Sequence, residues 1–206
     1  VVDGVTLQPL VKGKATIVIN RFGQWEMGVW GATSFPTKGF TPIAVRQNLS
    51  LLVSNGKITP LATTPRWILW GDPWKGAPAQ PRTGLGVDAQ GNLIFVGTME
   101  PVMPVTVAHA LVAAGAVTGM QLDMNPYWPV AGASIGVIHD AHGHFGVVMP
   151  NSEHPTSVFF DGWQRDFFVA LAAPGSWHCS WVSPGVNPAV TGAQPQPLSL
   201  QGRHCQ

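Results

Sequence analysis

The chain has 206 residues, which suits one domain, with or without a tail, and is long enough to bury a core. Only 10% of the residues are charged and the formal net charge is +1, so no broad electrostatic field attracts nucleic acid or an anionic membrane. The longest apolar run, residues 105–117, is shorter than the about 20 residues that cross a bilayer, and the opening VVDGVTLQPL lacks the segments of a signal peptide.

Apolar runs separated by turn residues predict four β-hairpins. The first joins residues 15–20 to residues 24–30 through RFG. In the second, residues 48–53 lead through Asn55-Gly56, a strong hairpin signal, into KITP. In the third, GLGVD and NLIFVG flank AQG, and in the fourth ASIGVIHD and HFGVVMP flank AHG.

Two helices are predicted among these strands. PVTVAHALVAAG begins with Pro104 and ends at Gly115, and a strand follows at residues 117–124. A second helix is predicted at residues 162–173. The fold class is therefore α+β, with the helices packed on one face of a twisted, largely antiparallel sheet. This domain spans residues 1–173, and residues 174–206 form a Pro/Gly-rich extended tail.

Several uncharged residues also bear on function. Nine tryptophans stand against one tyrosine; packing explains most of them, and stacking on sugar rings is the alternative for one or two. His139, His142 and His144 surround a glycine turn, where loop histidines are a stronger interpretation than a metal site. Cys179 and Cys205 form either a disulfide, which would imply export, or two free thiols.

Because charges are few, three charged residues are candidates for chemistry. Arg82 follows Pro81 at a strand entrance, where it either points into a cleft or lies on the surface. Arg46 precedes Gln47, Asn48 and an apolar strand. Asp123 ends the strand GMQLD, which would deliver a carboxylate on rigid support.

Asn125 lies two residues beyond Asp123. If the segment stays extended, both side chains face the same side and offer oxygen ligands suited to calcium, although hydrolysis without a metal is the simpler scheme. A turn that only shapes the loop is the alternative. The sequence contains no GxSxG, Walker or dinucleotide-binding motif.

PRTGLGVDAQGNLIFV, VAHALVAAGA and GMQLD, in this order, resemble the phosphodiester glycosidase family. VRQNLSLLVSNGKITP resembles the segment that precedes the family's arginine motif, and ATIVINRFGQWEMGVWG resembles the bacterial secreted branch. The likeness covers residues 15–173. The resemblance implies a secreted or cell-surface hydrolase that cleaves a sugar-1-phosphodiester bond in an extracellular or cell-wall glycan. It places the catalytic pair at Asp123 and Arg82. The substrate-binding positions are Arg46, Asn48, Thr83, Asn125 and Trp128.

The implied chemistry suits these residue types. A phosphate monoester is a good leaving group, so a cation that grips the phosphate matters more than a general acid, and arginine offers a planar fork of donors. The carboxylate of Asp123 would stabilise the oxocarbenium-like carbon, attack it or activate water. A second carboxylate would be Glu26, Asp72 or a residue outside this chain.

Two departures from the family pattern favour an alternative, a non-catalytic glycan-binding or structural domain. MNPYWP replaces a glycine-rich run that ends in serine, so Asn125 and Trp128 would take its place. The usual upstream Asn-Gly-Gly-aromatic motif is also missing. A separate N-terminal polypeptide, or a swapped subunit, is therefore expected to complete the sheet and the site.

Overall fold

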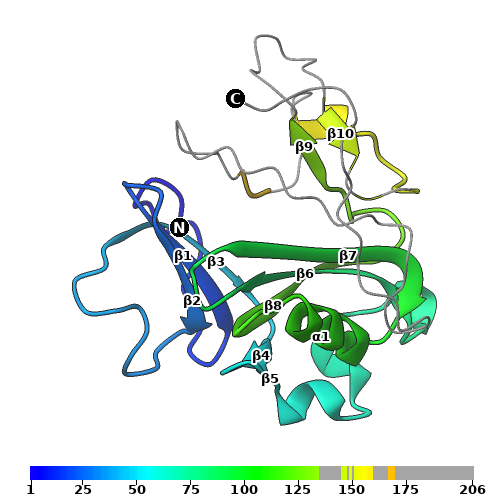
Figure 1. Ribbon diagram of the computed structural model, residues 1–206, viewed down its shortest axis with the longest axis horizontal. Coiled ribbons are helices and arrows are strands. Elements are labelled where there is room, and N and C mark those ends of the chain that lie inside the picture. Colours follow the sequence, from blue (N-terminus) through cyan, green and yellow to red (C-terminus); the bar gives the residue numbers. More distant parts are fainter. Residues whose placement is uncertain (135–144, 148, 150, 160–166, 170–206) are drawn as a thin grey trace. The chain divides into compact units, whose positions relative to one another are not determined.

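The computed structural model describes residues 1–134, 145–147, 149, 151–159 and 167–169 (Figure 1). The chain divides into two units, Val1–Pro129 with Asn151–Glu153 and Val130–Pro150 with His154–Gln206. All residues of the predicted site belong to the first unit. Within the described ranges, no helix is long and apolar enough to cross a membrane.

The first unit begins with a three-stranded antiparallel sheet in the order β2-β1-β3. Its strands are β1 (Ala15–Asn20), β2 (Trp25–Val29) and β3 (Pro42–Asn48). The first predicted hairpin is confirmed, because β1 pairs with β2 from Ala15↔Val29 to Ile19↔Trp25. The outer edge of β3 forms three backbone hydrogen bonds with the first residues of the chain. Val1 N donates to Val45 O (3.0 Å). Val45 N donates to Val1 O (3.0 Å), and Gly4 N donates to Ile43 O (2.8 Å).

A five-stranded sheet in the order β5-β4-β8-β6-β7 forms the centre of this unit, and every neighbouring pair is antiparallel. Its strands are β4 (Leu51–Ser54), β5 (Lys57–Ile58), β6 (Gln80–Val87), β7 (Leu93–Val102) and β8 (Thr118–Met124). The second and third predicted hairpins are thus confirmed. Asn55 and Gly56 adopt φ values of 52° and 68°, as a two-residue hairpin turn with two left-handed positions requires.

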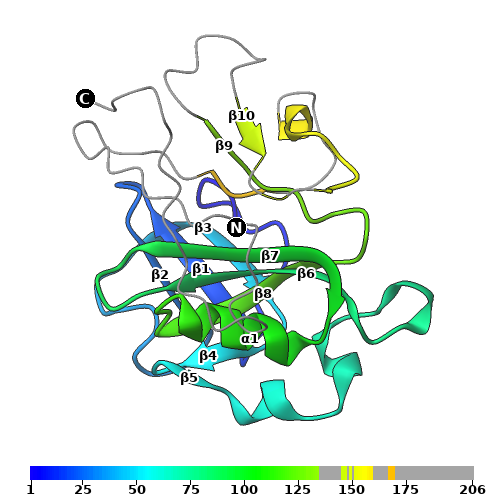
Figure 2. The ribbon, with the colours of Figure 1, turned by 45° about the vertical axis from the view of Figure 1, so that its right-hand side comes forward.

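One helix, α1 (Pro104–Ala113), packs on a face of the central sheet, as predicted (Figure 2). Pro104 stands in its first turn and Gly115, with φ of 93°, follows its end. The core on this side contains one cluster of buried apolar residues. They are Leu52, Val53, Ala62, Trp70, Val107, Ala108, Leu111 and Ala116.

Glycines of the sheet allow α1 to approach closely. A Cβ on Gly84 would lie 2.7 Å from Val107 Cγ1, and one on Gly119 would lie 2.9 Å from Leu111 Cδ1. A Cβ on Gly86 would lie 2.9 Å from Ala116 Cβ and 3.1 Å from Thr118 O. The absence of side chains at these positions therefore sets the distance between helix and sheet.

We expect Gly86→Ala to lower the free energy of unfolding by about 1–3 kcal/mol, the usual cost of overpacking a core. Ala116 Cβ and Thr118 O cannot rotate away, so the helix or the strand must shift. Urea unfolding measures this effect. Ala113→Ser, at an exposed position of α1, is the control and should change stability by no more than about 0.5 kcal/mol. Parental stability of Gly86→Ala would contradict the close contact.

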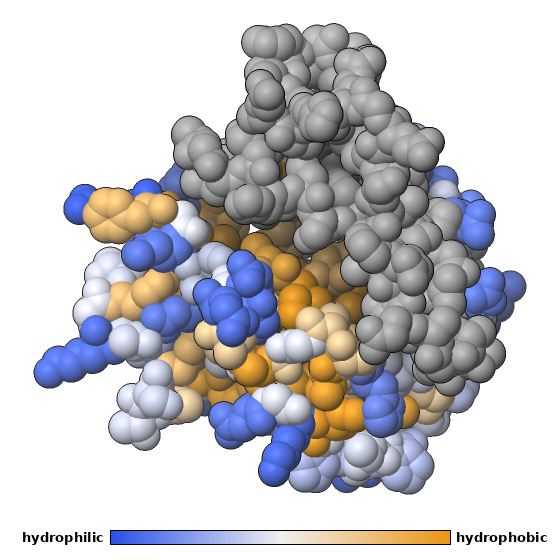
Figure 3. Space-filling model, in the orientation of Figure 1, coloured by the Kyte–Doolittle hydropathy of each residue, from blue (hydrophilic) through white to orange (hydrophobic). Residues whose placement is uncertain are grey.

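The opposite face of the central sheet packs against the three-stranded sheet. Ala15, Ile17 and Met27 of the smaller sheet meet Leu51, Leu85 and Met120 of the larger one in a second apolar cluster. The unit is therefore layered as helix, sheet and sheet, which confirms the α+β class. Hydrophobic residues gather in the middle of the face drawn in Figure 3, and many hydrophilic ones lie toward its rim.

The long connection between β5 and β6 contains three short 3-10 turns. These are η1 (Pro60–Thr63), η2 (Trp67–Trp70) and η3 (Trp74–Gly76). The sequence did not predict them, although the segment contains four prolines that interrupt regular pairing. This segment lies against the ends of β6 and β8, where the predicted site begins.

The second unit contains β9 (Gly132–Ser134), β10 (Phe145–Val147) and η4 (Thr156–Phe159). β9 and β10 pair antiparallel in the register Ser134↔Phe145 to Gly132↔Val147, which confirms the core of the fourth hairpin. Of the predicted helix at residues 162–173, residues 167–169 are described and form no helix. The rest of that helix, the three loop histidines, the tail and both cysteines lie outside the described residues.

Candidate functional site

Arg82 lies in the interior of the first unit rather than at the mouth of a cleft, since its side chain is 1% exposed. Nε donates to Val102 O (3.0 Å), and Nη2 donates to Pro78 O (3.0 Å). Nη1 donates to Gln121 Oε1 (2.7 Å) and lies 3.4 Å from Trp70 O and 3.1 Å from Met124 Sδ. At most one of its five N–H groups, on Nη2, has no acceptor among these atoms.

These acceptors are all neutral, so the guanidinium is a buried cation solvated by carbonyls and an amide. Desolvation by burial lowers the pKa of Arg82 from its ordinary value to about 10, which leaves it charged at neutral pH. Gln121 completes a closed triangle, because its Nε2 donates to Trp70 O (3.0 Å) while its Oε1 accepts from Arg82. This triangle ties η2 to the ends of β6 and β8.

The other face of the sheet carries Thr83, which is adjacent to Arg82 in β6 and therefore points the opposite way. Thr83 is 3% exposed, and its Oγ1 donates to the backbone carbonyl of Asp123 (3.1 Å). The Asp123 side chain is exposed at the end of β8. The predicted carboxylate thus stands on a strand end whose backbone is fixed from the neighbouring strand.

Asn48 joins the two sheets at this same strand end. Its Nδ2 donates to Gln121 O (2.9 Å) and Leu122 O (3.0 Å), and its Oδ1 accepts from Leu49 N (3.0 Å). Both ends of the amide are therefore bound to protein, which makes Asn48 a support of the site. Its role in contacting substrate stays a prediction.

The pairing register of β3 determines on which face of this strand Arg46 lies. It pairs with Ile17, whose side chain lies in the core between the sheets, so Arg46 leaves β3 on the side of the central sheet. Asn48, on the same face, meets β8 at Gln121 and Leu122, and the chain runs antiparallel to β8 from there. Arg46 lies two residues before Asn48 on this face of β3. Its side chain is exposed.

Asn125 shapes the loop after β8. Its Oδ1 accepts from the backbone N–H groups of Tyr127 (2.8 Å) and Trp128 (2.9 Å), and its own N–H donates to Pro81 O (3.1 Å). Both lone pairs of the amide oxygen are thereby used, which leaves none for calcium. Among the residues that the structure describes, no group of three or more His, Cys, Asp or Glu is arranged to hold a metal ion. The half-buried Trp128 follows in this loop.

The two candidates for a second carboxylate are placed differently. Glu26 pairs with Val18, on the face of the smaller sheet away from the central sheet, and its Oε2 accepts from Thr37 N (2.8 Å). Asp72 is exposed and follows Gly71, where a Cβ would lie 3.0 Å from Met124 Sδ. Asp72 is therefore the candidate that the fold brings near the end of β8.

The predicted site residues thus fall into two groups on opposite sides of β6. Thr83 and Asn48 bind the backbone of β8 near its end, where Asp123 lies, and Arg46 lies two residues before Asn48, while Arg82 is enclosed with Trp70 and Gln121. The first group combines an exposed carboxylate, an exposed guanidinium and a rigid backbone. Such a group can bind a phosphate through the arginine and take a proton on the aspartate.

No family model matches the chain, and neither does any curated protein. Among solved structures, the catalytic domain of zebrafish N-acetylglucosamine-1-phosphodiester alpha-N-acetylglucosaminidase, auto-inhibited by its pro-peptide, has a TM-score of 0.41 and 16% identity. A hypothetical protein from Synechocystis has a TM-score of 0.32 and 13% identity. The matches cover 55% and 56% of this chain but only 40% and 29% of those chains. Likenesses this weak establish neither family nor activity.

Proposed function

We propose that the protein hydrolyses a sugar-1-phosphodiester at the end of β8. The observation that carries the proposal is the position of Asp123, an exposed carboxylate on a strand end fixed by Thr83 and Asn48, with the exposed Arg46 two residues before Asn48 on β3. The rigid backbone favours a fixed direction of attack. The sequence resemblance implies the same substrate class.

In this mechanism, water adds to the anomeric carbon and gives its proton to Asp123. The bond between that carbon and the phosphate oxygen breaks, and the phosphate monoester leaves with the electron pair. Arg46 neutralises the phosphate through paired N–H donors. Because this leaving group is weakly basic, the step needs no strong general acid.

The proposal differs from the sequence-based hypothesis in the choice of cation. Arg82 donates to the carbonyls of Val102 and Pro78 and to Gln121, so a phosphate would have to displace buried bonds to reach it. Arg46 is exposed, so a phosphate can approach it from solvent. We therefore assign the phosphate to Arg46 and a supporting role to Arg82.

A non-catalytic glycan-binding domain is the second candidate. The enclosure of Arg82 favours it, because the cation that the motif would bring to the phosphate is committed to the fold. The scaffold alone does not decide between the two, since one fold hosts many functions.

The test is incubation with a panel of sugar-1-phosphodiesters in H₂¹⁸O, followed by mass detection. Cleavage at the anomeric carbon puts ¹⁸O into the released sugar. Heavy oxygen in the phosphate instead would identify attack at phosphorus and overturn the mechanism. Binding without turnover across the panel would favour the glycan-binding domain.

A further inference from the structure

Two aromatic side chains form an exposed pair near the end of β8. Trp74 is 47% exposed and Tyr127 is 40% exposed, and their ring centroids lie 5.3 Å apart at an interplanar angle of 85°. Trp74 belongs to η3 and Tyr127 to the loop after β8, so the fold brings together two segments distant in sequence. Large aromatic rings usually gain stability by burial, and this pair keeps much of its surface in water.

Polar side chains hold both backbones in place. Gln80 is 4% exposed, and its Nε2 donates to Trp74 O (3.2 Å) and Ala77 O (2.8 Å). Asn125 Oδ1 accepts from Tyr127 N (2.8 Å). The backbone segments that carry the exposed rings are therefore held in place, as a pre-organised binding surface requires.

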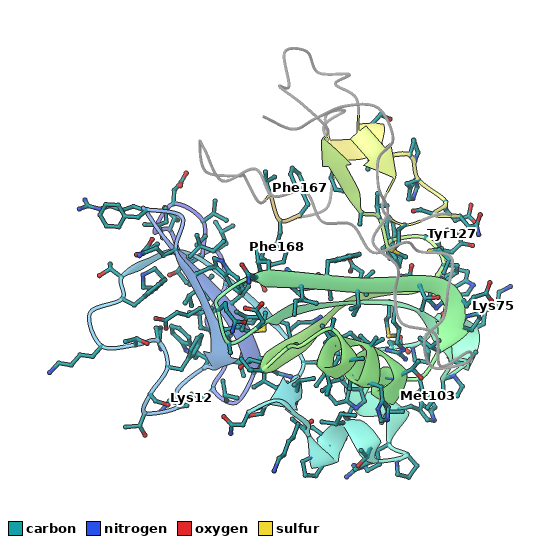
Figure 4. All side chains as sticks on the ribbon, viewed as in Figure 1. Lys12, Lys75, Met103, Tyr127, Phe167 and Phe168 are labelled. Atoms are coloured by element: carbon teal, nitrogen blue, oxygen red, sulfur yellow. The ribbon has the colours of Figure 1, made fainter. Side chains whose placement is uncertain are left out.

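A cation adjoins the pair. Lys75 has φ of 54° and ψ of 26°, a left-handed conformation that is unfavourable for a non-glycine residue. In this conformation its Nζ lies 6.0 Å from the centre of the Trp74 ring. Figure 4 shows Lys75 and Tyr127 at one end of the central sheet and Lys12 at the other.

We propose that Trp74, Tyr127 and Lys75 form a subsite for a pyranose ring that bears a phosphate. The apolar C–H face of a sugar matches exposed aromatic rings, and the ammonium matches the anion. Tyr127 is four positions after Asp123, which limits the distance between their Cα atoms to about 14 Å. The glycan as ligand class rests on the proposed function, and the subsite deepens it by fixing where a further part of the substrate lies.

A protein-docking surface explains the exposed pair of Trp74 and Tyr127 less well than a sugar subsite does. A protein-docking surface of useful size needs a contiguous apolar patch of several hundred Å², whereas Asp72, Lys75 and Gly76 are all exposed beside these rings. Phe22 provides a comparison within the chain. Its side chain is 72% exposed, and the centre of its ring lies 4.7 Å from the guanidinium carbon of Arg21. Phe22 stands in the turn between β1 and β2, however.

The test uses the Asp123→Asn chain, so that binding is measured without turnover. Hexose 1-phosphates, the matching methyl glycosides and inorganic phosphate are titrated while indole N–H signals are followed by NMR, with Trp74 assigned through Trp74→Phe. We expect hexose 1-phosphates to shift the Trp74 signal. Trp74→Ala and Tyr127→Ala should weaken binding about tenfold, while Phe22→Ala, the matched control, leaves it unchanged. Lys75→Gln should weaken binding of the phosphates but not of the methyl glycosides.

Three outcomes would overturn the subsite: no shift of the Trp74 signal with any sugar, a shift with inorganic phosphate alone, or equal weakening by Phe22→Ala. The proposed function fails separately. Sugar binding through Trp74 without hydrolysis by the parent chain would leave the subsite standing and exclude the enzyme. Hydrolysis with KM unaltered in Trp74→Ala and Tyr127→Ala would exclude the subsite and leave the enzyme standing.

Discussion

Asp123→Asn is expected to reduce hydrolysis of sugar-1-phosphodiesters by at least about 100-fold, the lower range for the loss of an acid–base group. The amide keeps the size of the side chain but cannot take a proton from water. Only the side chain changes, and the bond from Thr83 Oγ1 goes to the backbone carbonyl of Asp123. The strand end should therefore keep its conformation, and the loss should appear in kcat.

The control is Asp3→Asn, an exposed aspartate with φ of 47° in a conformation that asparagine also accepts. Its turnover should equal that of the parent. Both variants should also share the urea midpoint of the parent within experimental error. Near-normal turnover by Asp123→Asn would remove this residue from the mechanism.

Regular patterning made most of the first unit predictable. The hairpin dipeptide Asn55-Gly56, the helix that begins at Pro104 and the strand that ends at Asp123 each carry a local signal, and each is found in the structure. β3 was not predicted, and the second hairpin was expected to begin its first strand at residue 48, whereas β4 begins at Leu51. The chain changes sheets between Asn48 and Leu51. Only the pairing of Arg46 with Ile17 in one sheet, and of Leu51 with Met120 in the other, shows this change.

The candidate site was predictable only in part. Alternation along a strand already implies that the neighbours Arg82 and Thr83 point to opposite faces, so they were unsuited to one site. That the Arg82 guanidinium is enclosed depends on η2, whose Trp70 carbonyl is a partner that only the tertiary structure supplies. That Arg46 lies on the face of β3 toward the central sheet depends on its pairing with Ile17, which residue spacing alone does not contain.

The exposed aromatic pair left only a compositional trace in the sequence. The excess of tryptophan suggested a sugar platform for one or two of these residues, and Trp128 was the one assigned to substrate. Trp74 and Tyr127 were missed because their contact joins two loops. The only local signal was Lys75-Gly76 after Trp74, a dipeptide in which both residues adopt positive φ.

Arg82→Lys is expected to lower the free energy of unfolding by about 3 kcal/mol or more. The guanidinium reaches Val102 O, Pro78 O and Gln121 Oε1 from three different nitrogens, whereas an ammonium has its donors on one atom. Each bond to a charged group contributes roughly 1.5–3 kcal/mol, and buried acceptors left without a donor add their desolvation cost. The loss should therefore exceed that of any surface substitution.

The pH dependence of this stability has a defined sign. Because the folded pKa of Arg82, about 10, lies below its ordinary value, folding disfavours the charged form. Below pH 10 the group is charged in both states and the full cost of burying it is present. That cost declines only as the pH rises above 10 toward the pKa of the unfolded chain. Urea unfolding at neutral pH thus measures the buried cation.

The matched control is Arg46→Lys, which changes an exposed arginine on β3 and should alter stability by less than about 1 kcal/mol. If Arg46 binds the phosphate, the same variant should raise KM for the phosphodiester, since lysine loses the paired donors. The two arginines should thus separate, Arg82→Lys acting on unfolding and Arg46→Lys on substrate. Parental unfolding of Arg82→Lys, together with weakened inhibition by sugar phosphates, would reverse the assignment and return the phosphate to Arg82.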